Sequence, residues 1–338
     1  SQKLSNLGLT LVEHINLNSK NPFHIFFSYQ KLKKFIDDEQ INLINPHCSE
    51  GLPLFVFVAL SARSKRPESP IAIVRTRGTT RLLLNHWLNR KMHTDWIDYH
   101  ITAGEIVTQR LLSAVPQVEN KVKSIYFPAD CSVMHHKPVK NFWKEFEIPE
   151  YSTVLSVVGR IRAVKGQRIL LQSFSELLSE FPDLILLIPY RDTSENEPEM
   201  TALRKDINRL ILKDSVRLIP EREDILQIMK FSGLGIVSSV DSEVICRVAM
   251  EFFSVGTPII ALPTGCLPEI IKHGQNGMLA KSKTSEALVI EIRNVLSNPE
   301  LLDQISHGAR RDAEIRFNPG IMLDKTLEVF DSALSSYK

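Results

Sequence analysis

Two positively charged residues, Arg160 and Lys165, stand next to the glycines at the two ends of the run Gly159-Arg160-Ile161-Arg162-Ala163-Val164-Lys165-Gly166. Glycine lets the backbone approach an anion, arginine offers a planar fork of N–H donors, and lysine offers a compact positive charge. The run directly follows a β-rich segment, and open α/β sheets bind ligands at the carboxyl ends of their strands. The pattern favours a diphosphate site made by Gly159, Arg160 and Lys165. A basic surface turn before a helix is the alternative.

Two glutamates eight residues apart, Glu243 and Glu251, form a second candidate site. Apolar residues at helical spacing accompany them, namely Val244, Val248, Phe252 and Val255. This spacing predicts a helix that begins at Glu243 and stops at Gly256-Thr257-Pro258. At 1.5 Å per residue, the carboxylates would lie about 12 Å apart along the axis, on the scale of a sugar and a ribose. Ionised carboxylates only accept hydrogen bonds, which suits sugar hydroxyls; a capping glutamate and an unrelated surface glutamate are the alternative.

The elements that must position these residues are strands alternating with helices. The β-rich runs in the second half are Thr153–Val158, Leu184–Ile188, Val216–Ile219, Leu234–Val237 and Pro258–Ala261. After the first run, one predicted helix carries an apolar stripe formed by Leu170, Phe174, Leu177, Leu178 and Phe181. Such alternation predicts βαβ units, a parallel sheet and a complete Rossmann-like domain.

The first half follows the same pattern less completely. Its predicted strands are Leu9–His14, Ile41–Asn45, Ile71–Thr76, His100–Thr102 and Lys123–Tyr126. We expect a first domain at 1–130, an interdomain segment at 131–150, a second domain at 151–318 and a C-terminal helix at 319–338. Asn318-Pro319-Gly320 separates that last helix from the preceding one, and either domain could receive it. Its predicted apolar stripe is Leu323, Leu327, Phe330, Leu334 and Tyr337.

Composition excludes several classes of protein. A chain of 338 residues is long enough for two domains, and a net charge of +2 gives no sign of a nucleic-acid partner. The four cysteines are widely spaced, which argues for reduced thiols in a cytoplasmic protein without a zinc or other metal site. The longest apolar run, Leu52–Leu60, is about half the length that a membrane-spanning helix needs.

The order of the motifs resembles a known family. A GR-x4-KG turn followed by an E-x7-E helix, GTPIIA, LPEII and NGMLA resembles glycosyltransferase family 4, the group 1 retaining glycosyltransferases, over residues 153–317. The resemblance implies a GT-B fold, with two Rossmann-like domains whose parallel sheets face a central cleft. It also implies that Arg160 and Lys165 hold the diphosphate of a nucleotide-sugar donor, Glu243 contacts the sugar and Glu251 the ribose. No metal or other cofactor is implied.

Two departures from the family pattern stand out. Many members have E-G-F-G after the first glutamate, where this chain has Glu243-Val244-Ile245-Cys246. In the first half, Asn42–His47 resembles a family strand that ends in histidine, and Ile71–Gly78 resembles the next strand, where members often have a histidine in place of Gly78.

His47, Arg75 and Arg77 are the catalytic candidates of the first half, although a lone histidine at a strand end is more often structural. The family's opening strand, Gly-rich loop, helix and second strand have no counterpart in the chain. We therefore expect the sequence to be a fragment of a longer chain.

Other candidate residues have simple alternatives. Cys48 beside His47 suggests a thiol nucleophile, but a small buried cysteine is the usual reading. His135-His136 have no metal-ligating neighbours in sequence. The stretch Arg81–Lys91 mixes apolar residues with cations, and it fits either peripheral contact with a membrane surface or an ordinary packed helix with a basic face.

The resemblance therefore implies a cytoplasmic enzyme, at the inner face of the membrane if the basic stretch binds lipid. It would move a sugar to a glycan or lipid-linked acceptor in lipopolysaccharide or other cell-envelope polysaccharide synthesis. Gly78 and the missing strands favour an alternative, a non-catalytic sugar-nucleotide-binding protein with a degenerate first domain. A GT-B sugar-nucleotide epimerase is a third possibility.

Overall fold

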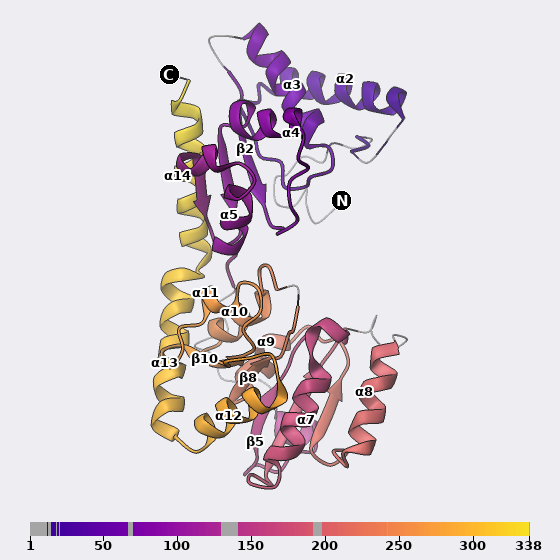
Figure 1. Ribbon diagram of the computed structural model, residues 1–338, viewed down its shortest axis with the longest axis vertical. Helices are drawn as coiled ribbons and strands as arrows, with labels where there is room; N and C mark the ends of the chain where they lie inside the picture. The colour runs from indigo at the N-terminus through magenta and orange to yellow at the C-terminus, as the bar shows by residue number, and fades with distance from the viewer. Residues whose placement is uncertain are drawn as a thin grey trace. The chain divides into compact units, whose positions relative to one another are not determined.

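The computed structural model describes residues 12, 15–17, 19, 21–66, 70–129, 141–191, 198–241 and 243–337. The chain divides into two compact units, each drawn as its own group of helices and strands in Figure 1. The first unit comprises Ser1–Ile125 and Asp324–Lys338, and the second comprises Tyr126–Leu323. Among the described residues, none of the helices has the length and apolar character that crossing a membrane requires.

The first unit contains a four-stranded parallel sheet in the order β1-β2-β3-β4. Its strands are β1 (Leu43–Ile44), β2 (Ala72–Arg77), β3 (Tyr99–Thr102) and β4 (Val122–Ser124). Its helical segments before the final helix are α2 (Pro22–Asp38), α3 (Leu52–Lys65), α4 (Trp87–Lys91), η1 (Met92–Trp96), α5 (Glu105–Leu112) and η2 (Pro116–Lys121). These four strands confirm the predicted ones, whereas the predicted strand Leu9–His14 lies outside the described residues except for Val12.

Apolar residues of α3 form part of the hydrophobic core of the first unit. Val56, Val58 and Ala59 are fully buried and belong to one cluster with Ile71 and Ile73 beside or in β2. Burying this run therefore fixes α3 against the sheet and, through it, the position of β2.

The stretch Arg81–Lys91 is not a packed helix. Only its last part is helical, in α4, and no residue of α4 is buried. Leu82, Leu84 and Trp87 are all largely exposed. The packed-helix interpretation of this stretch is therefore wrong.

The second unit contains a six-stranded parallel sheet in the order β10-β9-β8-β5-β6-β7. Its strands are β5 (Thr153–Ser156), β6 (Leu184–Pro189), β7 (Val216–Ile219), β8 (Leu234–Val237), β9 (Ile259–Ala261) and β10 (Gly277–Leu279). All five predicted strands are confirmed, and the missed one, β10, is a three-residue edge strand too short for a periodic signal. Because β5 pairs with both β6 and β8, the strand order reverses direction between β5 and β8.

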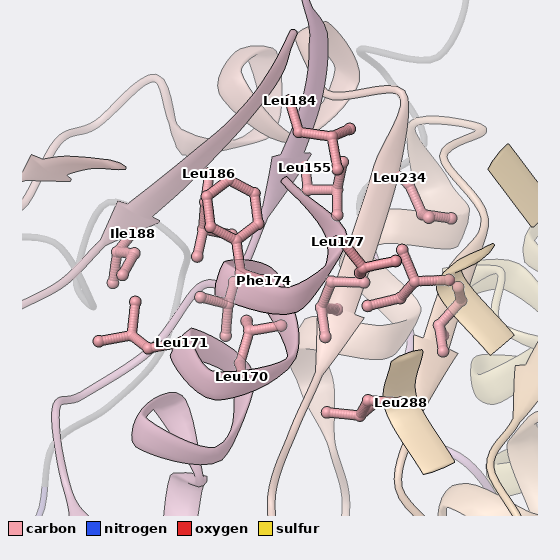
Figure 2. Close-up of a cluster of buried hydrophobic side chains, with 14 of the residues drawn as sticks. Leu155, Leu170, Leu171, Phe174, Leu177, Leu184, Leu186, Ile188, Leu234 and Leu288 are labelled. Carbon is pink, nitrogen blue, oxygen red and sulfur yellow. The ribbon is translucent and has the colours of Figure 1, made fainter. Parts of the chain in front are cut away.

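Helices pack against this sheet and complete the core of the second unit. They are α6 (Phe142–Glu145), η3 (Ala163–Lys165), α7 (Gln167–Leu177), α8 (Pro198–Arg209), α9 (Ile225–Phe231), α10 (Arg247–Ser254), α11 (Leu267–Ile270), α12 (Ser285–Leu296) and α13 (Pro299–Arg316). Leu170, Phe174 and Leu177 of α7 are fully buried, as their spacing predicts. Figure 2 shows these side chains in one cluster with Leu155 and Leu186 of the sheet.

Part of the expected interdomain segment belongs to the second unit. Phe142, Phe146 and Ile148 are buried in a cluster with Ile185 and Leu187 of β6. The short helix α6 spans only four residues, so its apolar residues gave no periodic pattern. Residues 131–140, including His135 and His136, lie outside the described part of the chain.

The final helix, α14 (Pro319–Ser335), begins where the Asn-Pro-Gly break predicts. Its predicted apolar stripe is only partly correct, because Leu323 and Leu327 are 54% and 46% exposed. The buried residues are Val329 and Ala333 instead. Beyond the helix, the Tyr337 hydroxyl donates to Asp98 Oδ1 at 2.6 Å, which ties the end of the chain to the rest of the first unit.

Candidate functional site

A pocket of about 690 Å³ lies in the second unit, at the carboxyl ends of its central strands. Its walls include Val157–Arg160 after β5, Pro220–Arg222 after β7 and Val237–Ser239 after β8. This is the point where the strand order reverses, which is where open α/β sheets bind ligands. The volume is in the range of small-molecule sites.

All five site candidates of the second half line this one pocket: Gly159, Arg160, Lys165, Glu243 and Glu251. The structure therefore brings together two motifs that are far apart in sequence. The other candidates, His47, Arg75 and Arg77, belong to the first unit.

The basic turn is fastened to the loop that follows β8. Gly166 has φ +65°, and a Cβ there would lie 2.0 Å from the carbonyl oxygen of Ser238. The Ser238 hydroxyl donates to the Lys165 carbonyl at 2.9 Å, and the Val240 N–H donates to the Val164 carbonyl at 2.9 Å. Gly166 is thus required by close packing, and these contacts fix the backbone that carries Lys165.

The two predicted donor-binding groups contact each other. The Lys165 ammonium donates to Glu243 Oε1, and the buried Ser239 hydroxyl donates to the same oxygen. Glu243 is only 5% exposed, whereas Lys165 is half-buried and Arg160 is exposed. Among the described residues, no ion pair involves Arg160, so its guanidinium is available to an anion.

Glu243 does not begin a helix, so that part of the prediction is wrong. Helix α10 starts at Arg247, and the preceding residue Cys246 has φ +41°. The 12 Å axial separation from Glu251 therefore does not apply. β-branched residues disfavour helix at 244 and 245, and they precede this left-handed residue. The buried residues of α10 include Ala249, Met250, Phe252 and Phe253, whereas Val244 and Val248 are half-buried at the pocket wall.

Contacts outside a helix hold the Glu243 backbone instead. The Cys266 N–H donates to the Glu243 carbonyl at 2.8 Å. Gly265 has φ +57°, and a Cβ there would lie 1.7 Å from the same carbonyl oxygen. Sequence reasoning missed Ser239, Gly265 and Cys266, because no spacing within the chain signals that these segments meet.

Glu251 lies on α10 and is half-buried in the pocket wall. Burial raises the pKa of its carboxyl, while Arg247 and Arg191 act in the opposite direction. Gln167, also missed, is buried and donates to the Arg160 carbonyl at 2.9 Å. The Glu251 carboxylate and the Arg160 loop, which Gln167 holds by this hydrogen bond, therefore line the same pocket.

Arg222 also reaches the pocket, but two carboxylates already match its charge. It donates to both oxygens of Asp224 at 2.7 Å and also contacts Glu145. Asp224 is the main cause of its raised pKa. This arginine therefore shapes the wall, and Arg191 and Arg247 line the pocket as well.

The structure brings His47 and Arg75 together in the first unit. Arg75 Nη1 donates to the Pro46 carbonyl at 2.8 Å, and Asn45 Nδ2 lies 3.1 Å from His47 Nε2. Burial and the nearby Arg75 charge both lower the pKa of His47. Gly78, where the family often has histidine, is exposed just beyond β2.

The cysteines divide into two environments. Cys48 is exposed, so the expectation of a small buried cysteine is wrong, while Cys246 and Cys266 are buried and free. Within the described ranges, no group of three or more His, Cys, Asp or Glu side chains is arranged to hold a metal ion.

Solved structures share the architecture. A glycosyltransferase from Rickettsia africae superposes with a TM-score of 0.86 at 20% identity, covering 98% of this chain and 87% of that one. Anabaena Alr3699/HepE, solved in complex with UDP, superposes with a TM-score of 0.78 at 20% identity, covering 90% and 82%. These similarities confirm the predicted GT-B fold.

Comparison of sequences identifies the family. Spore coat protein SA of Bacillus subtilis is 26% identical over 242 residues, which is 68% of this chain but only 64% of that protein's length. The model of the family described as glycosyl transferases group 1 matches residues 139–312. Because that match takes in more than half of the chain and includes the whole pocket, the chain belongs to the group 1 glycosyl transferases.

Proposed function

We propose that this protein is a retaining glycosyltransferase that moves a sugar from a nucleoside-diphosphate sugar to a glycan or lipid-linked acceptor. The observation that carries the proposal is that Arg160, Lys165, Glu243 and Glu251, the residues of both motifs, line one pocket among its other charged residues. Membership of the family supports it. The UDP bound to the Anabaena protein makes UDP the first nucleotide to test.

In this proposal, Arg160 and Lys165 bind the donor diphosphate. Negative charge grows on the leaving diphosphate as the glycosidic bond breaks, and these cations stabilise it in place of a metal ion. Losing one preorganised donor of this kind commonly costs about 10²–10³ in rate. Since Lys165 contacts Glu243 in the free protein, donor binding must share or replace that contact.

The glutamates would orient the two ends of the donor. Glu243 accepts hydrogen bonds from sugar hydroxyls and Glu251 from the ribose, so that the reacting atoms meet at near-attack distance. Retention by a front-face reaction, without a covalent enzyme intermediate, is the mechanism that the family resemblance implies.

The proposed acceptor is lipopolysaccharide or another cell-envelope glycan, reached from the cytoplasmic face of the membrane. The exposed Leu82, Leu84 and Trp87, with Arg81 and Lys91 in the same stretch, support peripheral membrane contact. Apolar side chains can enter the interface there while cations attract anionic headgroups.

Calorimetric titration with UDP, GDP and ADP tests the donor site. We expect one diphosphate to bind well and Lys165→Ala to weaken that binding far more than binding of the matching nucleoside. Lys213→Ala, which removes an exposed lysine outside the pocket, is the matched control and should bind like the parent. Equal losses for diphosphate and nucleoside would contradict the phosphate assignment.

One observation favours a second candidate, a non-catalytic sugar-nucleotide-binding protein. Gly78 stands at the end of β2, where a histidine is frequent in the family. Both functions need donor binding, so transfer or hydrolysis of the preferred nucleotide sugar separates them. Turnover that Lys165→Ala abolishes would exclude the non-catalytic candidate.

A further inference from the structure

Four buried cationic or imidazole side chains gather in the first unit, and none of them lines the pocket of the second unit. Arg75 and Arg77 on β2 are 1% and 3% exposed, and His93 in η1 and His100 in β3 are also buried. Arg75 pairs in register with His100, and the rings of His93 and His100 stack at 5.3 Å between centroids. The four side chains therefore form one cluster near the carboxyl end of the sheet.

Neither guanidinium group forms an ion pair with a carboxylate among the described residues, although the charge of the exposed Glu50 acts on Arg75 from a longer distance. Arg75 donates to the Pro46 carbonyl at 2.8 Å and to the Ser49 hydroxyl at 3.3 Å, and Arg77 donates to the Arg81 carbonyl. The Nε atoms of both arginines are buried without any hydrogen-bond partner. Burial lowers the pKa of Arg75 to about 10, so it stays charged at neutral pH.

The two histidines are uncharged at neutral pH, so they neither add to the guanidinium charges nor compensate them. Burial is the main cause that lowers the pKa of His93 to about 3 and of His100 to about 4, and both arginines lower them further. Both rings are therefore neutral at pH 7. His100 Nε2 donates to the His93 carbonyl at 3.1 Å, and the Nδ1 atoms of both rings have no partner.

A half-buried arginine of the same unit has a different environment. Arg63 forms an ion pair with Asp98 and donates to the Ile71 carbonyl at 2.7 Å. A buried charge without a partner is costly in free energy. Arg75 and Arg77 thus lack the compensation that the same unit provides for Arg63, and a bound anion would supply it.

Both guanidinium groups contact residues at the surface of the first unit. Arg75 reaches the exposed turn at Ser49, and Arg77 reaches the backbone of the exposed residue Arg81. The contacts that cover them are neutral hydroxyl and carbonyl groups. A phosphate or carboxylate would form stronger, charge-assisted and bidentate hydrogen bonds in their place.

We propose that Arg75 and Arg77 form an oxyanion-binding site that takes a phosphate or carboxylate group of an anionic acceptor. The identification of this anion with the acceptor rests on the proposed transferase function. The proposal that an anion binds here rests only on the burial and hydrogen bonds of residues in the first unit. The two oxyanions share the chemistry that a guanidinium fork recognises, and they are distinguished by experiment.

Thermal unfolding of the full chain carrying Lys165→Ala tests the site, because that change weakens phosphate binding in the donor pocket. We expect inorganic phosphate to raise the unfolding midpoint of this parent by more than about 2 °C over sodium chloride of equal ionic strength. Malonate in a parallel series measures the preference for carboxylate over phosphate.

Two variants of that parent locate the effect. Arg77→Met should abolish the stabilisation by anions without lowering the midpoint in chloride, because it replaces an uncompensated buried charge with an apolar side chain. Arg81→Met removes the same charge from an exposed position nearby and should keep the full response. A response that Arg77→Met retains, or that Arg81→Met also loses, would overturn the assignment.

The parent alone can also refute the site, so the test does not depend on how the variants fold. Equal midpoints in phosphate, malonate and chloride would mean that no oxyanion binds. A further titration with UDP uses the chain that has native Lys165 and carries only Arg77→Met. It distinguishes a failure of the oxyanion site from a failure of the proposed transferase function. Lost anion response with intact UDP binding supports the site, whereas absent UDP binding to the native chain counts only against the proposed function.

Discussion

At the scale of single residues, the proposed donor pocket has ionic groups that already contact each other. Glu243 is buried, and burying a carboxylate is costly in free energy unless hydrogen bonds compensate it. Lys165 and Ser239 donate these hydrogen bonds to one of its oxygens, Oε1. A sugar hydroxyl can therefore bind the carboxylate without first forcing it into position, and Ser239 becomes a candidate positioning residue.

We predict that Ser239→Ala lowers kcat about tenfold and leaves the Kd for UDP unchanged. Removing one hydrogen bond to a charged group costs about 1.5–3 kcal/mol, part of which Lys165 can recover. Steady-state kinetics with calorimetry measures both quantities. Ser173→Ala is the control, because Ser173 is a buried serine that bonds carbonyls outside the pocket. If both variants lose the same activity, Ser239 has only a structural role.

Substitution of the two glutamates should have different effects, one on UDP binding and the other on sugar transfer. Glu251→Gln removes a charged acceptor for ribose hydroxyls and should weaken UDP binding about 10- to 100-fold. Glu243→Gln should leave UDP binding within a few-fold of the parent and lower sugar transfer. Calorimetry with UDP and a transfer assay on the same two proteins decide the matter, and identical behaviour would refute this division of roles.

The sequence was sufficient to find the residues that line the pocket but not those that hold them. Arg160, Lys165, Glu243 and Glu251 carry charge in a recognisable order, and all four line one pocket. Ser239, Gly265 and Cys266 act through backbone and hydroxyl contacts between distant segments. Such contacts depend on tertiary packing, which leaves no local pattern.

At the scale of elements, the glycine turn between β5 and α7 links the strand end to the loop after β8. Gly166→Ala should destabilise the second unit by at least about 2 kcal/mol, since alanine meets the Ser238 carbonyl and prefers negative φ. It should also weaken UDP binding, because the same turn carries Lys165. Gly274→Ala is the matched control, because φ is +73° there but a Cβ would meet no atom within 4 Å, and Gly274 does not line the pocket. Urea unfolding and UDP titration compare the two variants, and equal effects would contradict a packing role for Gly166.

Strands and buried helices were predicted more accurately than partly exposed helices. The predicted strands of both sheets and the buried stripe of α7 follow hydrophobic patterns, which burial in the core enforces, whereas β10 was missed. The start of α10 and the buried face of α14 were wrong. In both cases apolar residues at helical spacing also occur on the exposed or pocket-facing side, and tertiary contacts determine which of them are buried.

At the scale of the whole molecule, the pocket of the second unit and the Arg75–Arg77 cluster of the first unit differ in how their charges are compensated. The second unit matches Lys165 with Glu243 and Arg222 with Asp224. The first unit leaves Arg75 and Arg77 without carboxylate partners and keeps His93 and His100 neutral beside them. Protonating these histidines would add positive charge to a cluster that already lacks compensation. The first unit should therefore be the acid-sensitive one.

The direction of this sensitivity follows from the histidine pKa values. The folded state lowers them from 6.5 to about 3 for His93 and about 4 for His100, so the unfolded chain binds protons first. Stability from these groups is complete above pH 6.5 and is lost as pH falls toward 4. At pH 5, each histidine should contribute a loss of about 2 kcal/mol relative to neutral pH.

Urea unfolding of the full chain at pH 7 and pH 5, in chloride buffers, measures this loss. His93→Phe should reduce the difference between the two pH values, because phenylalanine fills the same stacked position without binding a proton. His24→Phe, which changes an exposed histidine of the same unit, should leave the difference unchanged.

An oxyanion bound at Arg75 and Arg77 would offset the positive charge that the protonated histidines add. Phosphate should therefore stabilise the full native chain more at pH 5 than at pH 7. A first unit equally stable at both pH values would show that the histidines are not held neutral by burial beside these arginines.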